Sequence, residues 1–243
     1  MKTLQVQGLW VGDRISKLEF MSYNSFIKNK FEYILYTYNN IANLPEKIIV
    51  RDANTILNKR FIIRGRGVGG TTNSLGAFSD LFRWNLLYKK GGIYVDSDII
   101  CLKSFETKNN VAAGELDGKS LKVTAGTQYL KFEKSSPIIA KALKESKNKK
   151  LSITPWGSIG PTLINKLLPR ESILDYNNFN ANPNNNWNYV LYKHKTDFFL
   201  ELSEKENVYG IHLWNEMWRI NKINKNQNFP ENSYMAILEK KYL

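Results

Sequence analysis

Two aspartates, Asp96 and Asp98, stand two residues apart inside an otherwise apolar segment of the sequence. Burying a carboxylate without a partner is costly, so each side chain is expected to be ion-paired, protonated or bound to a metal. Residues i and i+2 of a strand face the same side, so the two carboxylates could converge on one cation. Oxygen ligands of this kind suit Mn²⁺ or Mg²⁺. A cation held there would bridge a diphosphate and neutralise its charge as a bond to it breaks.

The residues before this pair predict a buried helix followed by a short strand. Positions 74–90 carry apolar side chains on both sides of a helical pattern, and Gly91 and Gly92 provide a left-handed stop. The strand 93–95 then leads directly into Asp96. Open α/β sheets bind ligands at the carboxyl ends of their strands, which is where this order places the aspartates.

Two charged residues within the predicted helix could also face a ligand. Asp80 and Arg83 lie three residues apart and therefore share one face of the helix. They could contact a ligand, or they could form an ordinary ion pair at the surface.

The N-terminal third of the chain predicts the sheet that would position these residues. Segments 4–10, 31–38 and 47–50 have the composition of strands, and 16–29 has the apolar spacing of a helix. This order indicates a parallel sheet with crossover helices, the layout of nucleotide-binding α/β domains.

The rest of the chain carries weaker signals. The glycine-rich loop 64–72 contains two arginines and could be a lid over a charged ligand or a mobile surface loop. A helix is expected at 136–147, and another opens after 157–162. The asparagine-rich segment 175–188 is expected to be irregular, and 165–205 contains no motif that we can place. A lysine-rich helix is expected at the C-terminus.

The segment 78–98 carries the pattern Ser-Asp-x-x-Arg followed by Gly-Gly-x-Tyr-x-Asp-x-Asp. It resembles the sugar-binding region of glycosyltransferase family 32, which includes yeast mannosyltransferases and bacterial capsule and lipopolysaccharide enzymes. The glucosylating clostridial toxins share the pattern. Residues 7–12, 160–161 and 212–214 match further landmarks of the family.

The resemblance implies a GT-A fold, which is a Rossmann-like, mostly parallel sheet flanked by helices. It also implies a nucleotide-sugar donor, with a UDP-sugar expected, a divalent cation (Mn²⁺ or Mg²⁺) and retention of anomeric configuration. By the same resemblance, the donor and its metal would be held by Leu9, Trp10, Asp80, Arg83, Asp96, Ser97 and Asp98.

Individual roles follow from the same resemblance. Asp80 and Arg83 would contact the donor sugar, and with Asp96 they are the candidate catalytic residues. Asp96 would meet the ribose or sugar and reach the metal through water, while Asp98 would bind the metal directly. Trp10 would lie beside the nucleobase, although a tryptophan at a strand end could equally belong to the core.

A further metal ligand is expected near the C-terminus, because two aspartates, a diphosphate and water leave a divalent ion short of its preferred ligands. His212 is the candidate, as GT-A enzymes commonly recruit such a group there. It could instead be a core histidine, and Asn215 or Trp218 could make the phosphate contact in its place.

We therefore expect a single domain over residues 1–243, with a nucleotide-sugar-binding half (1–103) and an acceptor-side half (104–243). It would transfer a hexose to a glycan or lipid-linked glycan in bacterial surface polysaccharide synthesis. The alternative is a non-catalytic module that binds nucleotide sugars or glycans. No retaining nucleophile is singled out, although Glu115 and Asp117 are nearby carboxylates.

The bulk properties limit location and partners. The chain has a formal net charge of +13 and one cysteine, Cys101, so an intramolecular disulfide is excluded. Neither a signal peptide nor an apolar run of about 18–20 residues is evident, so a cytoplasmic protein is expected. The basic charge suggests peripheral contact with an anionic membrane. Nucleic acid is not expected, because no known nucleic-acid-binding signature is present. A basic adaptor without catalytic function remains a third interpretation.

Overall fold

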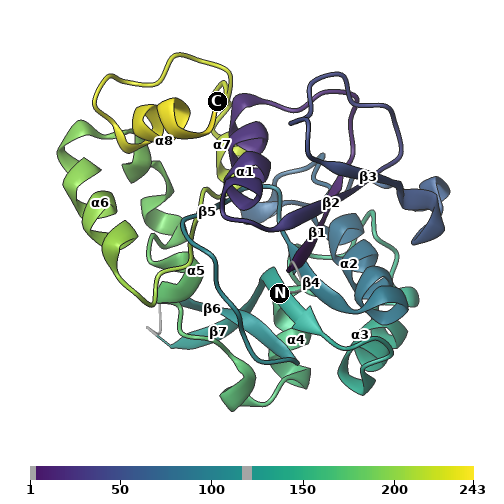
Figure 1. The fold of residues 1–243 in the computed structure, drawn as a ribbon. Coiled ribbons are helices and arrows are strands. Elements are labelled where there is room, and N and C mark those ends of the chain that lie inside the picture. The colour runs from purple at the N-terminus through teal and green to yellow at the C-terminus, as the bar shows by residue number, and fades with distance from the viewer. Residues whose placement is uncertain (1–3, 117–121) are drawn as a thin grey trace.

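Six strands form one sheet through the centre of the molecule, in the order β3-β2-β1-β4-β7-β6 (Figure 1). The computed structural model describes residues 4–116 and 122–243. The pairs β1–β2, β2–β3 and β1–β4 are parallel, whereas β4–β7 and β6–β7 are antiparallel. The predicted α/β class with a mostly parallel sheet is therefore confirmed. The six strands are β1 (Gln5–Trp10), β2 (Glu32–Thr37), β3 (Ile49–Asp52), β4 (Gly92–Val95), β6 (Val111–Leu116) and β7 (Val123–Phe132).

Helices lie on both faces of this sheet. They are α1 (Lys17–Lys28), α2 (Gly76–Lys90), α3 (Pro137–Lys147), α4 (Pro161–Leu167), α5 (Asn177–Asn180), α6 (Thr196–Glu204), α7 (Asn215–Ile220) and α8 (Tyr234–Tyr242). Short 3₁₀ segments occur at Ala53–Thr55, Lys59–Phe61, Val68–Gly70, Arg170–Ser172, Asn184–Leu191 and Lys193–Lys195.

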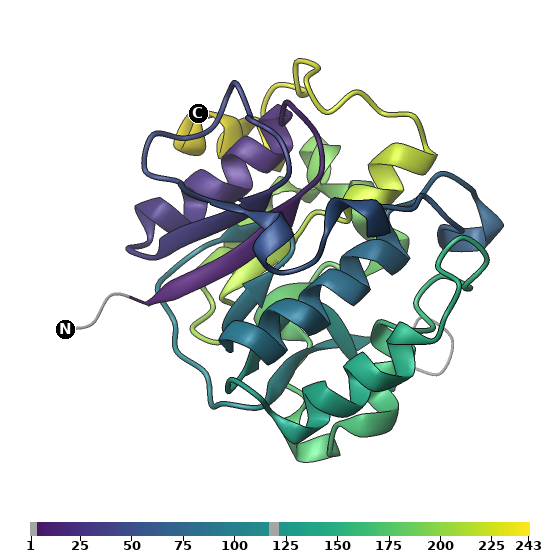
Figure 2. The same cartoon turned by 90° about the vertical axis from the view of Figure 1, so that its right-hand side faces the viewer.

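The alternation of side chains along β2 shows how the sheet is covered. Tyr33 points to the face packed by α1, where its ring lies 4.8 Å from that of Tyr23. Tyr36 points to the opposite face and packs on Phe82 of α2, with ring centroids 6.0 Å apart. Helices α2 and α3 lie side by side on this second face (Figure 2). The strand period of two thus separates two cores.

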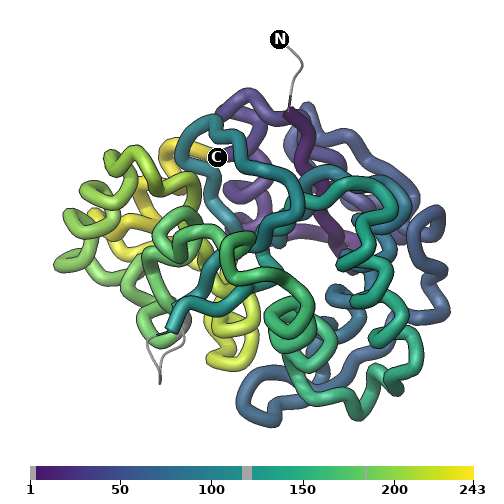
Figure 3. Tube along the Cα trace, turned by 90° about the horizontal axis from the view of Figure 1, so that it is seen from below, coloured from purple at the N-terminus to yellow at the C-terminus, as the bar shows by residue number. Residues whose placement is uncertain are grey.

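A third core joins the C-terminal segments to the sheet domain. It gathers buried residues of α6, α7 and α8 around Trp218 and reaches α1 through Leu18 and Met21. These segments, coloured green to yellow, lie mainly on the left of Figure 3. A separate two-stranded antiparallel sheet of β5 (Ile99–Cys101) and β8 (Gly210–His212) connects them to the end of β4.

Most elements occur where the sequence predicts them. The strands expected at 4–10 and 31–38 and the helices at 16–29, 74–90 and 136–147 are present, with ends that differ by one or two residues. The segment 175–188 is more ordered than expected, because it contains α5 and the start of a 3₁₀ segment. No helix among the described residues combines the length and apolar character needed to cross a bilayer.

Candidate active site

The Asp96–Asp98 pair lies in a turn rather than in a strand. β4 ends at Val95 and β5 begins at Ile99, so the expectation that the two aspartates share one side of a strand is wrong. The chain leaves the central sheet here because β5 pairs with β8 instead. The turn is held on both sides, since the Asp96 N–H donates to the carbonyl of Gln128 (2.9 Å) and the Leu213 N–H donates to the carbonyl of Asp98 (2.8 Å).

The turn nevertheless brings the carboxylates together with His212. One ligand atom from each of Asp96, Asp98 and His212 lies within 4.8 Å of the others. His212 is the last residue of β8 and pairs with Ile99, which places its ring beside the turn. Its Nε2 lies 3.4 Å from Asp98 Oδ2. These are the three residues predicted as metal ligands.

The hydrogen bonds around Asp98 leave one oxygen for a further partner. Oδ2 accepts from the Asn215 N–H at 2.6 Å, at the start of α7. Oδ1 has no hydrogen-bond partner among the described residues, although Asp98 is only 5% exposed. An unpaired oxygen on a buried carboxylate is costly unless a ligand satisfies it. The donor set of two carboxylates and an imidazole therefore fits a divalent cation.

The electrostatics of this cluster differ between its members. Burial opposes ionisation of Asp98, but His212 and the Asn215 N–H hold the pKa of that carboxyl below its usual value. Burial alone would lower the pKa of His212. The Asp98 carboxylate outweighs this effect, so the pKa of His212 is raised overall. Burial raises the pKa of Asp96, despite the nearby Arg83 guanidinium. Asp98 is thus the more strongly ionised of the two aspartates.

Arg83 connects the turn to helix α2. Its Nη2 lies 3.2 Å from Asp96 Oδ1, its Nε lies 3.5 Å from Asp80 Oδ1, and its Nη1 donates to the carbonyl of Thr127 at 2.7 Å. The guanidinium also lies 4.8 Å from the centre of the Tyr94 ring. Asp80 and Arg83 thus form an ion pair, but it is buried and not at the surface, because Arg83 is 4% exposed and Asp80 is 5% exposed.

Asp80 lies against a loop from the second half of the chain. Burial raises the pKa of Asp80 to about 7, with Arg83 opposing the rise. A β-carbon built on Gly160 would lie 2.2 Å from Asp80 Oδ2, so the carboxylate occupies the space that any side chain at this position would need. This contact gives a physical reason for glycine before Pro161, where α4 begins.

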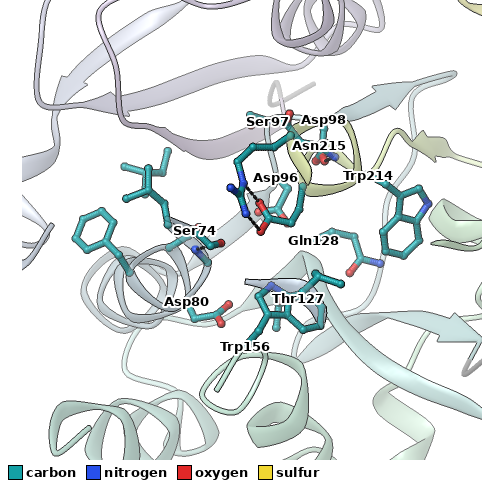
Figure 4. A pocket seen from close by; sticks show the side chains of 18 of the residues that line it. Ser74, Asp80, Asp96, Ser97, Asp98, Thr127, Gln128, Trp156, Trp214 and Asn215 are labelled. Atoms are coloured by element: carbon teal, nitrogen blue, oxygen red, sulfur yellow. Dashed lines mark hydrogen bonds and ion pairs between the residues drawn. The ribbon is translucent and has the colours of Figure 1, made fainter. Parts of the chain in front are cut away.

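All eight residues predicted for the site line one cavity of about 520 Å³. They are Leu9, Trp10, Asp80, Arg83, Asp96, Ser97, Asp98 and His212. Figure 4 labels four of them, Asp80, Asp96, Ser97 and Asp98. Trp10 is partly buried at the end of β1, and its Nε1 donates to the carbonyl of Arg14 at 2.9 Å. Its indole is therefore held in place in the cavity wall.

The second half of the chain contributes residues that the sequence did not single out. Gln128 is 2% exposed, lines the cavity, and has no hydrogen-bond partner for either amide atom among residues 4–116 and 122–243. Trp156, which is 45% exposed, lines the cavity opposite the turn (Figure 4). Glu115 also lines it, and burial raises the pKa of that carboxyl. Asp117 lies outside the described residues.

The glycine-rich loop 64–72 is attached to α7. Arg219 Nη1 donates to the carbonyl of Thr72 at 3.1 Å, and Arg219 also pairs with Glu216 at 2.6 Å. Arg64 and Val68 of this loop line the cavity. The loop therefore forms part of the cavity wall.

Comparison with known proteins gives the class of this site. Residues 22–116 match the family model described as the glycosyltransferase sugar-binding region containing the DXD motif. The predicted resemblance is confirmed over this segment, which makes up less than half of the chain. The structure has the mostly parallel α/β sheet that the resemblance implied, with the Asp-x-Asp turn directly after β4.

A curated protein of Arabidopsis thaliana, described as uncharacterized, is 39% identical over 70 residues. That match covers 28% of this chain and 10% of the plant protein, so the chain spans about a tenth of the length of that relative. Among solved structures, the PaToxG glycosyltransferase is 14% identical with a TM-score of 0.47, and the match covers 99% of this chain and 86% of that one. The bifunctional glycosyltransferase WbbM has the same identity and TM-score, over 99% of this chain and 51% of its own.

Proposed function

We propose that the protein is a retaining glycosyltransferase that moves a hexose from a nucleotide-sugar donor, with a UDP-sugar expected, and requires Mn²⁺ or Mg²⁺. The observation that carries the proposal is the cluster of Asp96, Asp98 and His212 in the wall of the large cavity. Asp96 and Asp98 lie within the segment that matches the sugar-binding family model, and His212 lies outside it. A cation bound there would neutralise the diphosphate that leaves with the nucleoside.

The buried side chains would hold the two ends of the donor. Trp10 and Leu9 lie at the end of β1, where a nucleobase could pack on the indole. Arg83 and Asp80 also line the cavity, and their ion pair fixes them to each other. The guanidinium can donate hydrogen bonds to sugar hydroxyls, and the carboxylate can accept them. Gln128 offers both functions from the neighbouring strand β7. Asp80, Arg83 and Gln128 are buried, so a donor bound against them would take the place of water at these groups.

The acceptor would enter from the side of the second half of the chain. Trp156 is the exposed aromatic residue on that side of the cavity, and an indole face can pack on a sugar ring. We assign a glycan or lipid-linked glycan as the acceptor, in bacterial surface polysaccharide synthesis at the inner face of the membrane. The net charge of +13 supports contact with anionic lipid.

A panel of nucleotide sugars tests this proposal through the release of nucleoside diphosphate with and without added Mn²⁺. We expect release from one donor, dependent on the metal and lost on chelation. Binding of a nucleotide sugar without any release, in the presence of candidate acceptors, would instead favour a non-catalytic binding module. Release that persists in excess chelator would contradict the metal requirement.

A further inference from the structure

Asn180, the last residue of α5, contacts the histidine of the proposed metal cluster. It comes from the stretch 165–205, in which the sequence offered no motif, and it is only 1% exposed. Its amide lies between β6 and β8, where it bonds one residue of each strand. It does not line the cavity, so any effect on a ligand must act through a neighbour.

The two hydrogen bonds of Asn180 fix the orientation of its amide. Asn180 Nδ2 lies 2.6 Å from the carbonyl oxygen of Gly114. A carbonyl oxygen only accepts hydrogen bonds, so the amide nitrogen must face it and the amide oxygen must face the other way. That oxygen, Oδ1, lies 3.1 Å from His212 Nδ1.

This orientation determines where the hydrogen of a neutral His212 ring lies. Asn180 Oδ1 can only accept, so Nδ1 of His212 must carry the hydrogen and donate it. In the neutral ring Nε2 then has the lone pair. Nε2 is the ring atom that faces Asp98, at 3.4 Å from Oδ2. A metal-binding histidine needs its lone pair on the side of the cation, and its other nitrogen is normally held by a hydrogen bond of this type.

The same segment also fixes the tilt of the ring. The Trp214 side chain packs on His212 with ring centroids 4.0 Å apart and an angle of 32° between the rings. Trp214 is itself held by donation from its Nε1 to the carbonyl of Asn182 at 2.8 Å. Two asparagines of one segment thus hold the imidazole directly and through its neighbour.

We propose that Asn180 is a positioning residue that keeps His212 in the tautomer whose Nε2 can bind a divalent cation beside Asp98. The proposal rests on the metal-dependent function proposed above. It makes α5, outside the segment that matches the family model, a part of the metal site.

The tautomer can be measured without metal or activity, because the sequence contains only two histidines. Long-range ¹H–¹⁵N correlation spectra would be recorded at a pH high enough that both rings are neutral. His194 is exposed and serves as an internal reference, which should favour hydrogen on Nε2 as free imidazole side chains do. We expect His212 to show the opposite pattern, with hydrogen on Nδ1. Hydrogen on Nε2 of His212 would overturn the proposal.

Metal affinity provides the second measurement, with Mn²⁺ titrated against the full chain by electron paramagnetic resonance. Asn180→Ala should weaken Mn²⁺ binding by about 10–100-fold, the usual effect of removing the partner of a metal-binding histidine. Asn178→Ala is the matched control, because Asn178 lies in the same helix, donates from Nδ2 to the carbonyl of Asn207 at 2.7 Å, and does not bond His212. We expect the control to bind Mn²⁺ as the wild type does.

The outcomes separate this proposal from the function on which it rests. Unchanged Mn²⁺ affinity in Asn180→Ala, or an equal loss in both variants, would overturn the positioning role. The wild type could also bind no Mn²⁺ while His212 carries its hydrogen on Nδ1. That result would contradict the proposed metal-dependent function but would still support the effect of Asn180 on the ring. If Asn180→Ala does not fold, the wild-type spectrum still decides the tautomer.

Discussion

The carboxylate of Asp80 lies against the α-carbon of Gly160, from a helix and a loop that are 80 residues apart in the chain. A β-carbon on residue 160 would approach Asp80 Oδ2 to 2.2 Å, a distance that real contacts do not reach. Because Arg83 also holds Asp80 through an ion pair, the carboxylate cannot move away freely. The position of the loop before α4 is thus coupled to a predicted donor-sugar residue.

The first prediction tests this contact. Gly160→Ala should lower kcat/KM for the donor sugar at least about tenfold, because the added methyl group displaces Asp80 or moves the loop. A double-mutant cycle with Asp80→Ala is the control, since the clash disappears when the carboxylate is absent. If the changes in activation free energy, calculated from kcat/KM, were strictly additive in the double mutant, the two residues would not interact.

The second prediction concerns stability and pH in the metal-free protein. The pKa of Asp80 is raised from 3.8 to about 7. Folding therefore favours the protonated form of Asp80. Its contribution to the free energy of unfolding is fully present below about pH 4 and is lost as the pH rises to about 7. Asp80→Asn stays neutral throughout, so its free energy of unfolding relative to the wild type should increase from pH 4 to 8, by a few kcal/mol at most. Denaturant titrations at several pH values measure the difference.

The exposed residue Glu46 provides the control for that experiment. Glu46→Gln also replaces a carboxylate by an amide, but at the surface and away from the cavity, so it is the matched control for the substitution itself. Parallel profiles for Asp80→Asn and the wild type would contradict the raised pKa of Asp80.

The third prediction concerns the proposed metal ligand. Asp98→Asn keeps the shape of the side chain but removes the charge that attracts a cation, so Mn²⁺ affinity should fall at least about tenfold and turnover should be lost. Asp197→Asn makes the same change of net charge at an exposed residue of α6 and should have no effect. Full activity of Asp98→Asn would exclude direct metal binding by this residue.

The fourth prediction concerns the basic surface. Exposed lysines such as Lys141 and Lys144 of α3 and Lys240 and Lys241 of α8 could each contribute about 1 kcal/mol near an anionic bilayer. The protein should sediment with vesicles that contain anionic lipid at low salt, and should dissociate as the salt concentration rises. Neutral vesicles are the control. Equal binding to both kinds of vesicle, or to neither, would remove the membrane interpretation.

The sequence predicted the parts of the site that local patterns can encode. Asp80 and Arg83 share a helix, so their spacing alone brings them together. Asp96 and Asp98 follow β4 directly, as predicted, but they converge through a turn and not through the alternation of a strand. His212 was inferred from resemblance and from the number of ligands that a cation prefers. Its place beside Asp98 depends on the pairing of β5 with β8, which no local pattern predicts.

Gln128 and Asn180 were missed for a related physical reason. Each owes its position to a contact between segments that are distant in the sequence. Gln128 lies beside Asp96 because β7 pairs antiparallel with β4. Asn180 reaches His212 from a four-residue helix within an asparagine-rich segment. A polar residue in such surroundings has no periodicity that would distinguish it from a solvated loop.

The pairing of Ile99 in β5 with His212 in β8 also bears on how the protein assembles. These two strands are separated by more than a hundred residues, and closing so long a loop delays contacts of this kind relative to local ones. On a ribosome, Asp96 and Asp98 emerge well before the histidine that faces them. We therefore expect cation binding to appear late in refolding, after the helices have formed and only once the C-terminal segment has docked.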